Sequence, residues 1–330
     1  MIKSAKQLFD AVGEKLAGQF PRQLLKGDQP SGYRPSQPGS VELHTEDYLT
    51  LKTATAETKG LPSGAGAFFF SGCAAAAAVY LFAGSPILAL QVLAFGAAFF
   101  AVFFIWELYR PFPLPIVFNR RTREIYYDLN GKLYHTPWEG IEAVAYEYRN
   151  VNQYAGSMVH GNLEIILQRF GHPEDRIALN IGGHTSGKRL QTLVSLWEYL
   201  RAYMNEGPWF DDLGHQLPEK GDFIAKQLER SQFSMRGLLK KAQDEFAQEK
   251  AEGQGISGNV FFGLVSAYAF HPVWFTADVT YKICRSRSHN QWPEVVQERM
   301  RPDGPTTQLA DIEEGYAEAE KERWAHLPRN

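Results

Sequence analysis

The feature that most limits how this chain can fold is a run of 46 residues without a formal charge, Leu61 to Trp106, whose only side-chain amide is Gln91. One membrane-spanning helix needs about 20 apolar residues, so this run is long enough for two. Gly84-Ser85-Pro86 interrupts the run near its middle, as expected for a tight reversal. The sequence therefore predicts a transmembrane hairpin of helices 64–83 and 86–106. A hairpin buried in a water-soluble domain is the less favoured alternative.

The basic residues beside this run predict its orientation. Lys52 and Lys59 precede it, and the turn between the two helices has no charge. The second helix is followed by Arg110, Arg120, Arg121 and Arg123. Because basic residues concentrate on the cytoplasmic side of membrane helices, we expect both termini and the soluble domains to face the cytoplasm. The predicted location is the bacterial inner membrane, reached through residues 64–106.

Composition narrows the classes of partner and cofactor. The net charge of −3 gives no overall attraction to nucleic acid, and none is expected as a partner. Only two cysteines occur, Cys73 and Cys284, which excludes a disulfide framework and fits a reducing compartment. His160, His172 and His184 could converge in the fold, but no pair of histidines has the spacing of helical metal ligands. We expect no catalytic residue, no cofactor and no metal.

After the hairpin, the pattern changes to short alternating segments typical of strands. A helix from about Lys188 to Asn205 follows, and Asn130-Gly131 predicts a tight hairpin turn. The six predicted strands are 115–118, 124–127, 132–135, 143–148, 163–167 and 176–181. Antiparallel strands followed by one amphipathic helix resemble a pleckstrin-homology-like barrel in element order. The expected fold class is α+β: the transmembrane hairpin, this barrel with its C-terminal helix, and a mainly helical C-terminal region.

Four parts of the chain are expected from these patterns. They are 1–60, with an N-terminal amphipathic helix, a linker at 26–46 and a short strand at 47–52; 61–109, the transmembrane hairpin; 110–206, the pleckstrin-homology-like domain; and 207–330, the helical C-terminal region with an acidic tail.

The C-terminal region contains two further helical patterns. A charged stretch, 222–252, predicts a helix with one apolar side. Residues 256–275 carry no formal charge and are long enough to span a membrane. A third span would place Lys282 and Arg285 outside the cell, against the usual charge bias. We favour an apolar segment that lies on the membrane or returns to the soluble domain.

One short motif deserves comparison with a phosphate-binding loop. Gly182-Gly183-His184-Thr185-Ser186-Gly187-Lys188 lies between a predicted strand and a predicted helix. The next position is Arg189, where a phosphate-binding loop has a hydroxyl that ligates magnesium. We therefore interpret the motif as a turn in which Thr185 or Ser186 caps the helix, and we do not expect an enzyme.

Several local patterns carry a family resemblance. They are the segment from Arg110 to Tyr126 with the sequence RPFPLPIVFNRRTREIY, then Pro137-Trp138-Glu139, and finally Gln291-Trp292-Pro293-Glu294-Val295-Val296. Together with the preceding hairpin, they resemble a bacterial family of uncharacterised domains found beside type VI secretion effectors. Members of that family act as immunity or accessory proteins.

The resemblance implies a stoichiometric binding function. The chain would bind and neutralise a cognate toxic effector, and a cytoplasmic body would suit a toxin with a cytoplasmic target, such as a nuclease. Aromatic and acidic side chains are candidate contacts for such a partner: Trp209, Phe210, Asp211, Asp212 and Phe223. The alternative is a membrane-tethered scaffolding or effector-loading accessory protein that binds a peptide or a lipid.

Overall fold

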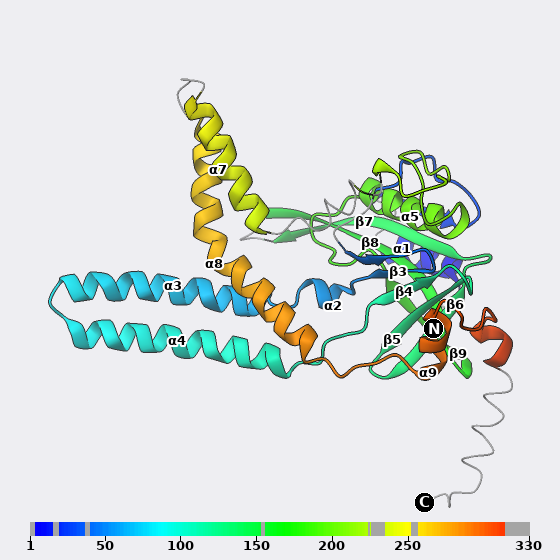
Figure 1. Ribbon diagram of the computed structural model, residues 1–330, viewed down its shortest axis with the longest axis horizontal. Coiled ribbons are helices and arrows are strands. Elements are labelled where there is room, and N and C mark those ends of the chain that lie inside the picture. The colour runs from blue at the N-terminus through cyan, green and yellow to red at the C-terminus, as the bar shows by residue number, and fades with distance from the viewer. Residues whose placement is uncertain are drawn as a thin grey trace, which may run out of the picture. The chain divides into compact units, whose positions relative to one another are not determined.

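The structure is a computed structural model that describes residues 4–15, 20–36, 40–152, 156–223, 225, 235–251 and 257–313. The chain forms two compact units, each assembled from separate stretches of sequence. The sheet body contains residues 1–57, 113–231 and 291–330, and the helical unit contains residues 58–112 and 232–290. Figure 1 shows the elements of both units.

A curled antiparallel sheet forms the centre of the sheet body. Within the described residues it has nine strands: β1 (Arg22–Lys26), β2 (Val41–His44), β3 (Tyr48–Leu51), β4 (Ile116–Asn119), β5 (Glu124–Leu129), β6 (Lys132–Pro137), β7 (Glu142–Asn152), β8 (Gly156–Arg169) and β9 (His172–Asn180). Their order is β1-β7-β8-β6-β5-β4-β3-β2, and β9 pairs with β8 beside this path. The long strand β8 pairs with β7 over most of its length and with β6 and β9 near its end.

The sheet joins strands from both sides of the apolar run. β3 pairs with β4, with Leu49 opposite Phe118 and Leu51 opposite Ile116. β1 likewise pairs with β7. The main chain before and after the apolar run therefore belongs to one hydrogen-bonded sheet.

Successive residues of a strand point to opposite faces of a sheet, and both faces of β4 are covered. Ile116 and Phe118 belong to the main core, which includes Trp197 and Leu200 of helix α5 (Leu190–Asn205). The intervening Val117 belongs to a second cluster, in which the C-terminal segment contributes Trp292 and Val296 together with Leu309. Helix α9 (Glu294–Met300) carries part of this segment, and α1 (Ala5–Lys15) covers a third cluster around Val144.

The elements predicted between residues 115 and 205 are confirmed as β4 to β9 and α5. Asn130 and Gly131 both have positive φ, 55° and 79°, as the tight turn between β5 and β6 requires. The expectation of a linker at 26–46 is wrong in part, because β2 lies within it. β1 was also not expected. Both strands form by pairing with other strands, β1 with β7 and β2 with β3. Local composition alone does not predict such pairing.

The helical unit contains α3 (Leu61–Phe82), α4 (Pro86–Tyr109), α7 (Met235–Ala251) and α8 (Gly258–Ser286), while the short α2 (Ala54–Glu57) ends the first stretch of the sheet body. Gly84 in the turn between α3 and α4 has a φ of 76°, which glycine adopts without strain. Of the predicted charged helix at 222–252, residue 224 and residues 226–234 lie outside the described residues, as do residue 252 and the acidic tail from 314 onward.

Candidate functional site

Among the residues that the structure describes, three helical segments are long and apolar enough to cross a membrane: α3 with the residues just before it, α4 and α8. Their apolar side chains are largely exposed; Phe82, for example, is 94% exposed. Other large exposed side chains on α3 and α4 include Val79, Leu81, Ile87, Leu90, Phe95, Val102 and Ile105. Water-soluble proteins rarely expose contiguous apolar surface on this scale, and such surface marks a membrane or partner contact.

A carboxylate closes the base of the α3 and α4 pair. Glu107 of α4 is 1% exposed, and it accepts hydrogen bonds from the backbone N–H of Gly60 at 2.6 Å and of Ser63 at 2.9 Å. These N–H groups belong to the first turn of α3, which has no internal partners for them. A negative charge at this end also interacts favourably with the helix dipole. Lys59 donates to the carbonyl of Arg110 at 2.8 Å, so each helix satisfies polar groups at the end of the other.

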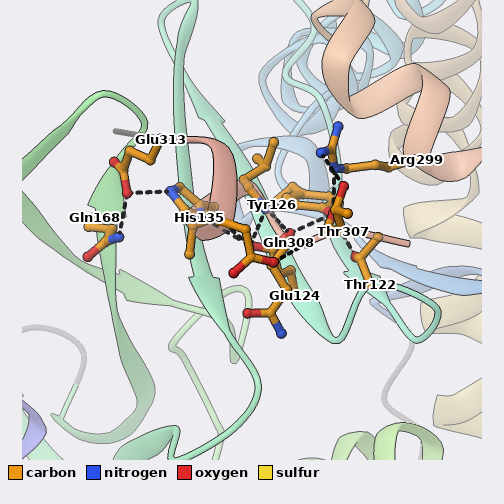
Figure 2. A network of polar contacts seen from close by, with 12 residues as sticks. Thr122, Glu124, Tyr126, His135, Gln168, Arg299, Thr307, Gln308 and Glu313 are labelled. Atoms are coloured by element: carbon orange, nitrogen blue, oxygen red, sulfur yellow. Dashed lines mark hydrogen bonds and ion pairs between the residues drawn. The ribbon is translucent and has the colours of Figure 1, made fainter. Parts of the chain in front are cut away.

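A second set of buried polar contacts holds the C-terminal segment on the sheet (Figure 2). Glu124 of β5 is fully buried, and its carboxylate accepts hydrogen bonds from the N–H of Leu309 at 2.8 and 2.9 Å. Tyr126 donates to the same carboxylate at 2.9 Å and accepts from Thr122. Burial, reinforced by the Glu124 charge, raises the pKa of Tyr126, so this hydroxyl keeps its proton.

His135 lies between two carboxylates in this network (Figure 2). Its Nδ1 is 3.3 Å from Glu124, and its Nε2 is 3.7 Å from Glu313. Glu313 also accepts from Gln168 at 3.0 Å and from the N–H of Gly171 at 2.9 Å. On the other side, buried Arg299 donates to the carbonyls of Val295 and Thr307. The network therefore connects β5, β6 and β8 to a segment more than 140 residues further along the chain.

The predicted partner-binding residues occupy different environments in the sheet body. Phe210 is fully buried beside Tyr199, so its ring stabilises the core of the folded body. Phe223 is half-buried and packs on Phe210. Asp211 accepts from the N–H groups of Leu213 and His215, and these bonds lower the pKa of Asp211 although partial desolvation opposes them.

Trp209 and Asp212 are the more accessible members of this set. Trp209 is partly buried, and its ring stacks on His44 at 5.3 Å. The side chain of Asp212 is 60% exposed and lies 3.8 Å from Arg34. Partner binding by this segment stays a prediction, and Asp212 is its best-exposed charged group.

His44 anchors this segment to the sheet. Its Nε2 lies 2.6 Å from the carbonyl of Pro208, to which it donates, and its Nδ1 lies 2.8 Å from the hydroxyl of Tyr199, from which the neutral ring accepts. Burial lowers the pKa of His44 from 6.5 to about 4; the charge of Lys220 contributes, while the Pro208 carbonyl opposes the shift. Sequence patterns gave no sign of this role, because His44 lies in the stretch interpreted as a linker.

The Gly182–Arg189 segment forms a turn before α5, but its predicted cap is wrong. Neither Thr185 nor Ser186 caps the helix; instead Glu147 of β7 accepts from the N–H of Leu190 at 2.9 Å. The Lys188 amino group donates to the Gly182 carbonyl and lies 3.9 Å from Glu57. Its charge is therefore already paired within the protein, and burial lowers its pKa.

The predicted basic flank of the hairpin also has structural contacts. Arg121 lies 4.0 Å from Asp47 and donates to the carbonyl of Gly304 at 2.7 Å. Arg123 forms an ion pair with Glu139 at 2.7 Å. Among the residues that the structure describes, no group of three or more His, Cys, Asp or Glu side chains is arranged to hold a metal ion.

Comparison with protein families gives one match, a family of unknown function (DUF6708), whose model matches residues 93–303. The chain belongs to the DUF6708 family. The match begins within α4 and continues through the sheet strands β4 to β9, α5, α7 and α8 to the end of α9, so it covers parts of both units. No curated protein and no solved structure matches this DUF6708 chain.

Replacing Glu124 with glutamine should weaken attachment of the C-terminal segment. The amide NH₂ cannot accept a hydrogen bond, so Leu309 keeps one acceptor instead of two, and either Tyr126 or the N–H of Ala310 loses its partner. The free energy of unfolding should fall by about 2–4 kcal/mol. Urea unfolding in detergent measures this change. Hydrogen exchange at the amides of Leu309 and Ala310 should accelerate more than exchange within α5.

The control for this change is Glu174→Gln, which alters an exposed carboxylate of the same body. It should change the free energy of unfolding by less than about 0.5 kcal/mol. If the two variants had equal free energies of unfolding, Glu124 would not stabilise the attachment of the C-terminal segment, and the prediction would be wrong.

The buried histidine predicts loss of stability in mild acid. Because the pKa of His44 is about 4 in the folded state and near 6.5 when unfolded, the unfolded state binds the proton first as the pH falls. The stability that the neutral His44 contributes is therefore fully present above pH 6.5 and is lost as the pH falls from 6.5 to 4. By pH 5 the free energy of unfolding should have fallen by about 2 kcal/mol. His44→Gln should remove this share of the pH dependence, measured as the difference in unfolding free energy between pH 7 and pH 5.

His289→Gln changes an exposed histidine and should leave the pH dependence as in the wild type. If His44→Gln also leaves the pH dependence of the unfolding free energy unchanged, then protonation of His44 does not destabilise the folded protein, which would contradict the prediction.

Proposed function

We propose that this chain is a membrane-anchored binding protein, held in the bacterial inner membrane by α3 and α4, with its sheet body in the cytoplasm. The pairing of β3 with β4 supports this topology most directly. Strands of one sheet lie on one side of a membrane, so the chain between them crosses it an even number of times. Two consecutive apolar helices joined by the turn at 83–85 meet that condition.

The contacts at the base of the pair also support the anchor. The hydrocarbon core of a bilayer offers no hydrogen-bond donors or acceptors, so polar groups that face it need partners within the protein. Glu107 and Lys59 provide such partners at the end where the chain enters and leaves the pair. The other end carries only the short turn around Gly84, too small for an extracellular active site.

We infer that the sheet body binds a protein partner stoichiometrically. The resemblance to domains encoded beside type VI secretion effectors supports an immunity protein that neutralises a cognate toxic effector. A body on the cytoplasmic side suits a toxin with a cytoplasmic target, such as a nuclease. The order β4 to β9 followed by α5 supports a pleckstrin-homology-like core, enlarged here by β1 to β3.

A scaffolding or effector-loading role is the second candidate. β2 is the last strand in the sheet order and, within the described residues, pairs on one side only, with β3. An edge strand of this kind can accept an extended peptide as an additional strand. Leu43 on β2 is exposed and available for such a contact.

The anchor is tested by labelling single cysteines in a chain that carries Cys73→Ala and Cys284→Ser. Ser85→Cys in the turn should react with a membrane-impermeant maleimide on intact spheroplasts. Asp212→Cys on the sheet body should react only after the membrane is opened, because the bilayer separates it from the reagent. Protection of Ser85→Cys on intact spheroplasts, or labelling of Asp212→Cys there, would contradict the topology.

The partner is tested by co-expression with each candidate toxin encoded next to this gene. We expect growth to be restored and the toxin to co-purify in detergent. Asp212→Arg should weaken co-purification at least about ten-fold, the effect of losing about 1.4 kcal/mol of binding free energy. Asp303→Arg makes the same charge change at another exposed position and should bind normally. Absence of both protection and co-purification rejects the immunity role, and protection without co-purification rejects stoichiometric binding.

A further inference from the structure

Helix α8 is the third apolar helix, and its two halves have different neighbours. Pro272 divides it, and a proline inside a helix removes one backbone hydrogen bond. The second half packs on α3, where a Cβ added to Gly64 would lie 2.4 Å from the carbonyl oxygen of Val273. The first half runs beside α7, as Figure 1 shows. Gln243 of α7 donates to the hydroxyl of Tyr268 at 2.7 Å, and Glu249 accepts from the N–H of Ser257 at 2.8 Å.

The α7 and α8 pair separates apolar from charged side chains. On α8, the half-buried positions that face its neighbours recur at helical spacing: Val260, Leu264, Ala267 and His271. The rest of this half exposes large apolar side chains, namely Phe261, Phe262, Val265 and Phe270, of which Phe262 is 70% exposed. On α7, the exposed positions include Lys240, Asp244 and Lys250. The outer face of α8 in this pair is thus apolar, and the outer face of α7 is charged.

The connections of the chain argue against a single crossing of the membrane by α8. Residues on either side of it belong to the sheet body. Before it, Phe223 packs on the main core; after it, the Asn119 side chain donates to the Arg299 carbonyl at 2.9 Å, and Glu124 accepts from the N–H of Leu309. These segments lie on the same side of any membrane. Between residues 225 and 291, α8 is the only described helix that is long and apolar enough to span, and a single crossing would separate them.

The charges of α7 give a second, independent argument. Because α7 packs along the first half of α8, a crossing by α8 would carry Lys240, Asp244 and Lys250 into the hydrocarbon. A charged side chain at the centre of a bilayer costs about 2.5–3.5 kcal/mol even on the lowest scales. At the membrane surface, by contrast, the apolar face contacts acyl chains while the charged face stays in water.

We propose that α7 and α8 form a membrane-surface element, in which the face made by Phe261, Phe262, Val265 and Phe270 binds the cytoplasmic leaflet without crossing it. The inference rests on the proposed membrane anchoring by α3 and α4. The bilayer is the chosen occupant because the exposed Phe270 ring stacks on the exposed Phe68 ring of α3 at 5.6 Å, which joins this face to the exposed apolar surface of the proposed anchor. The exposed Arg287 directly after α8 suits anionic headgroups.

Two cysteines at the ends of α8 test whether it crosses. In the chain with Cys73→Ala and Cys284→Ser, Asn259→Cys and His289→Cys should both be protected on intact spheroplasts and both react after lysis. Labelling of either cysteine without the other on intact spheroplasts overturns the inference, because a crossing by α8 would place its two ends on opposite sides of the membrane. Ser85→Cys is the reference: its protection rejects the hairpin anchor, whereas the comparison of Asn259→Cys with His289→Cys reports on α8 alone.

A depth measurement tests lipid contact directly. Spin labels at Phe262→Cys and, as the matched control on the charged face, at Asp244→Cys are compared in the full chain. The chain is reconstituted in vesicles of phosphatidylethanolamine and phosphatidylglycerol. The ratio of accessibility to oxygen over a water-soluble nickel complex should be several-fold higher at Phe262→Cys. Equal ratios at the two positions overturn the proposal, because the face would then contact water or protein.

Discussion

The antiparallel pairing of β3 with β4 is the constraint on which the rest of the structure depends. These strands are adjacent in the sheet but are separated along the chain by the whole of α3 and α4. Their hydrogen bonds form only if the chain returns to the place it left. The same requirement applies after α8, where α9 and the residues up to Glu313 pack back onto β5, β6 and β8. The apolar helices are therefore insertions in the chain between segments that belong to one sheet body.

Buried ionisable groups determine where each of these chain segments attaches. Glu124 holds the C-terminal segment, His44 holds the segment at 208–210, and Glu107 holds the first turn of α3. Each joins parts of the chain that are distant in sequence, and each is satisfied by groups that no other register would supply. Burying a charge or an imidazole without such partners costs several kcal/mol, so a misplaced return would be strongly disfavoured. Apolar packing alone would not distinguish between registers so sharply.

This arrangement gives the two units separate tasks in the proposed function. The helical unit offers apolar surface to lipid, through α3 and α4 as a crossing and through α8 as a surface contact. The sheet body has its charged and aromatic groups largely engaged internally: Arg121 and Arg123 hold turns, Lys188 faces Glu57, and Phe210 fills the core. Partner recognition by the body then depends on exposed positions such as Asp212 and on the β2 edge.

The sequence by itself determined the local elements of this protein. The uncharged run with its central Gly-Ser-Pro located α3 and α4, because helix length and charge are local properties. Alternation and the Asn130-Gly131 turn located β4 to β9, and apolar spacing located α5. Only the tertiary structure decided that β1 and β2 complete the sheet, that the C-terminal segment covers its second face, and that Glu147, instead of Thr185 or Ser186, satisfies the start of α5. The reason is that each of these depends on a partner far away in the chain, and neither periodicity nor composition records which distant residues will meet.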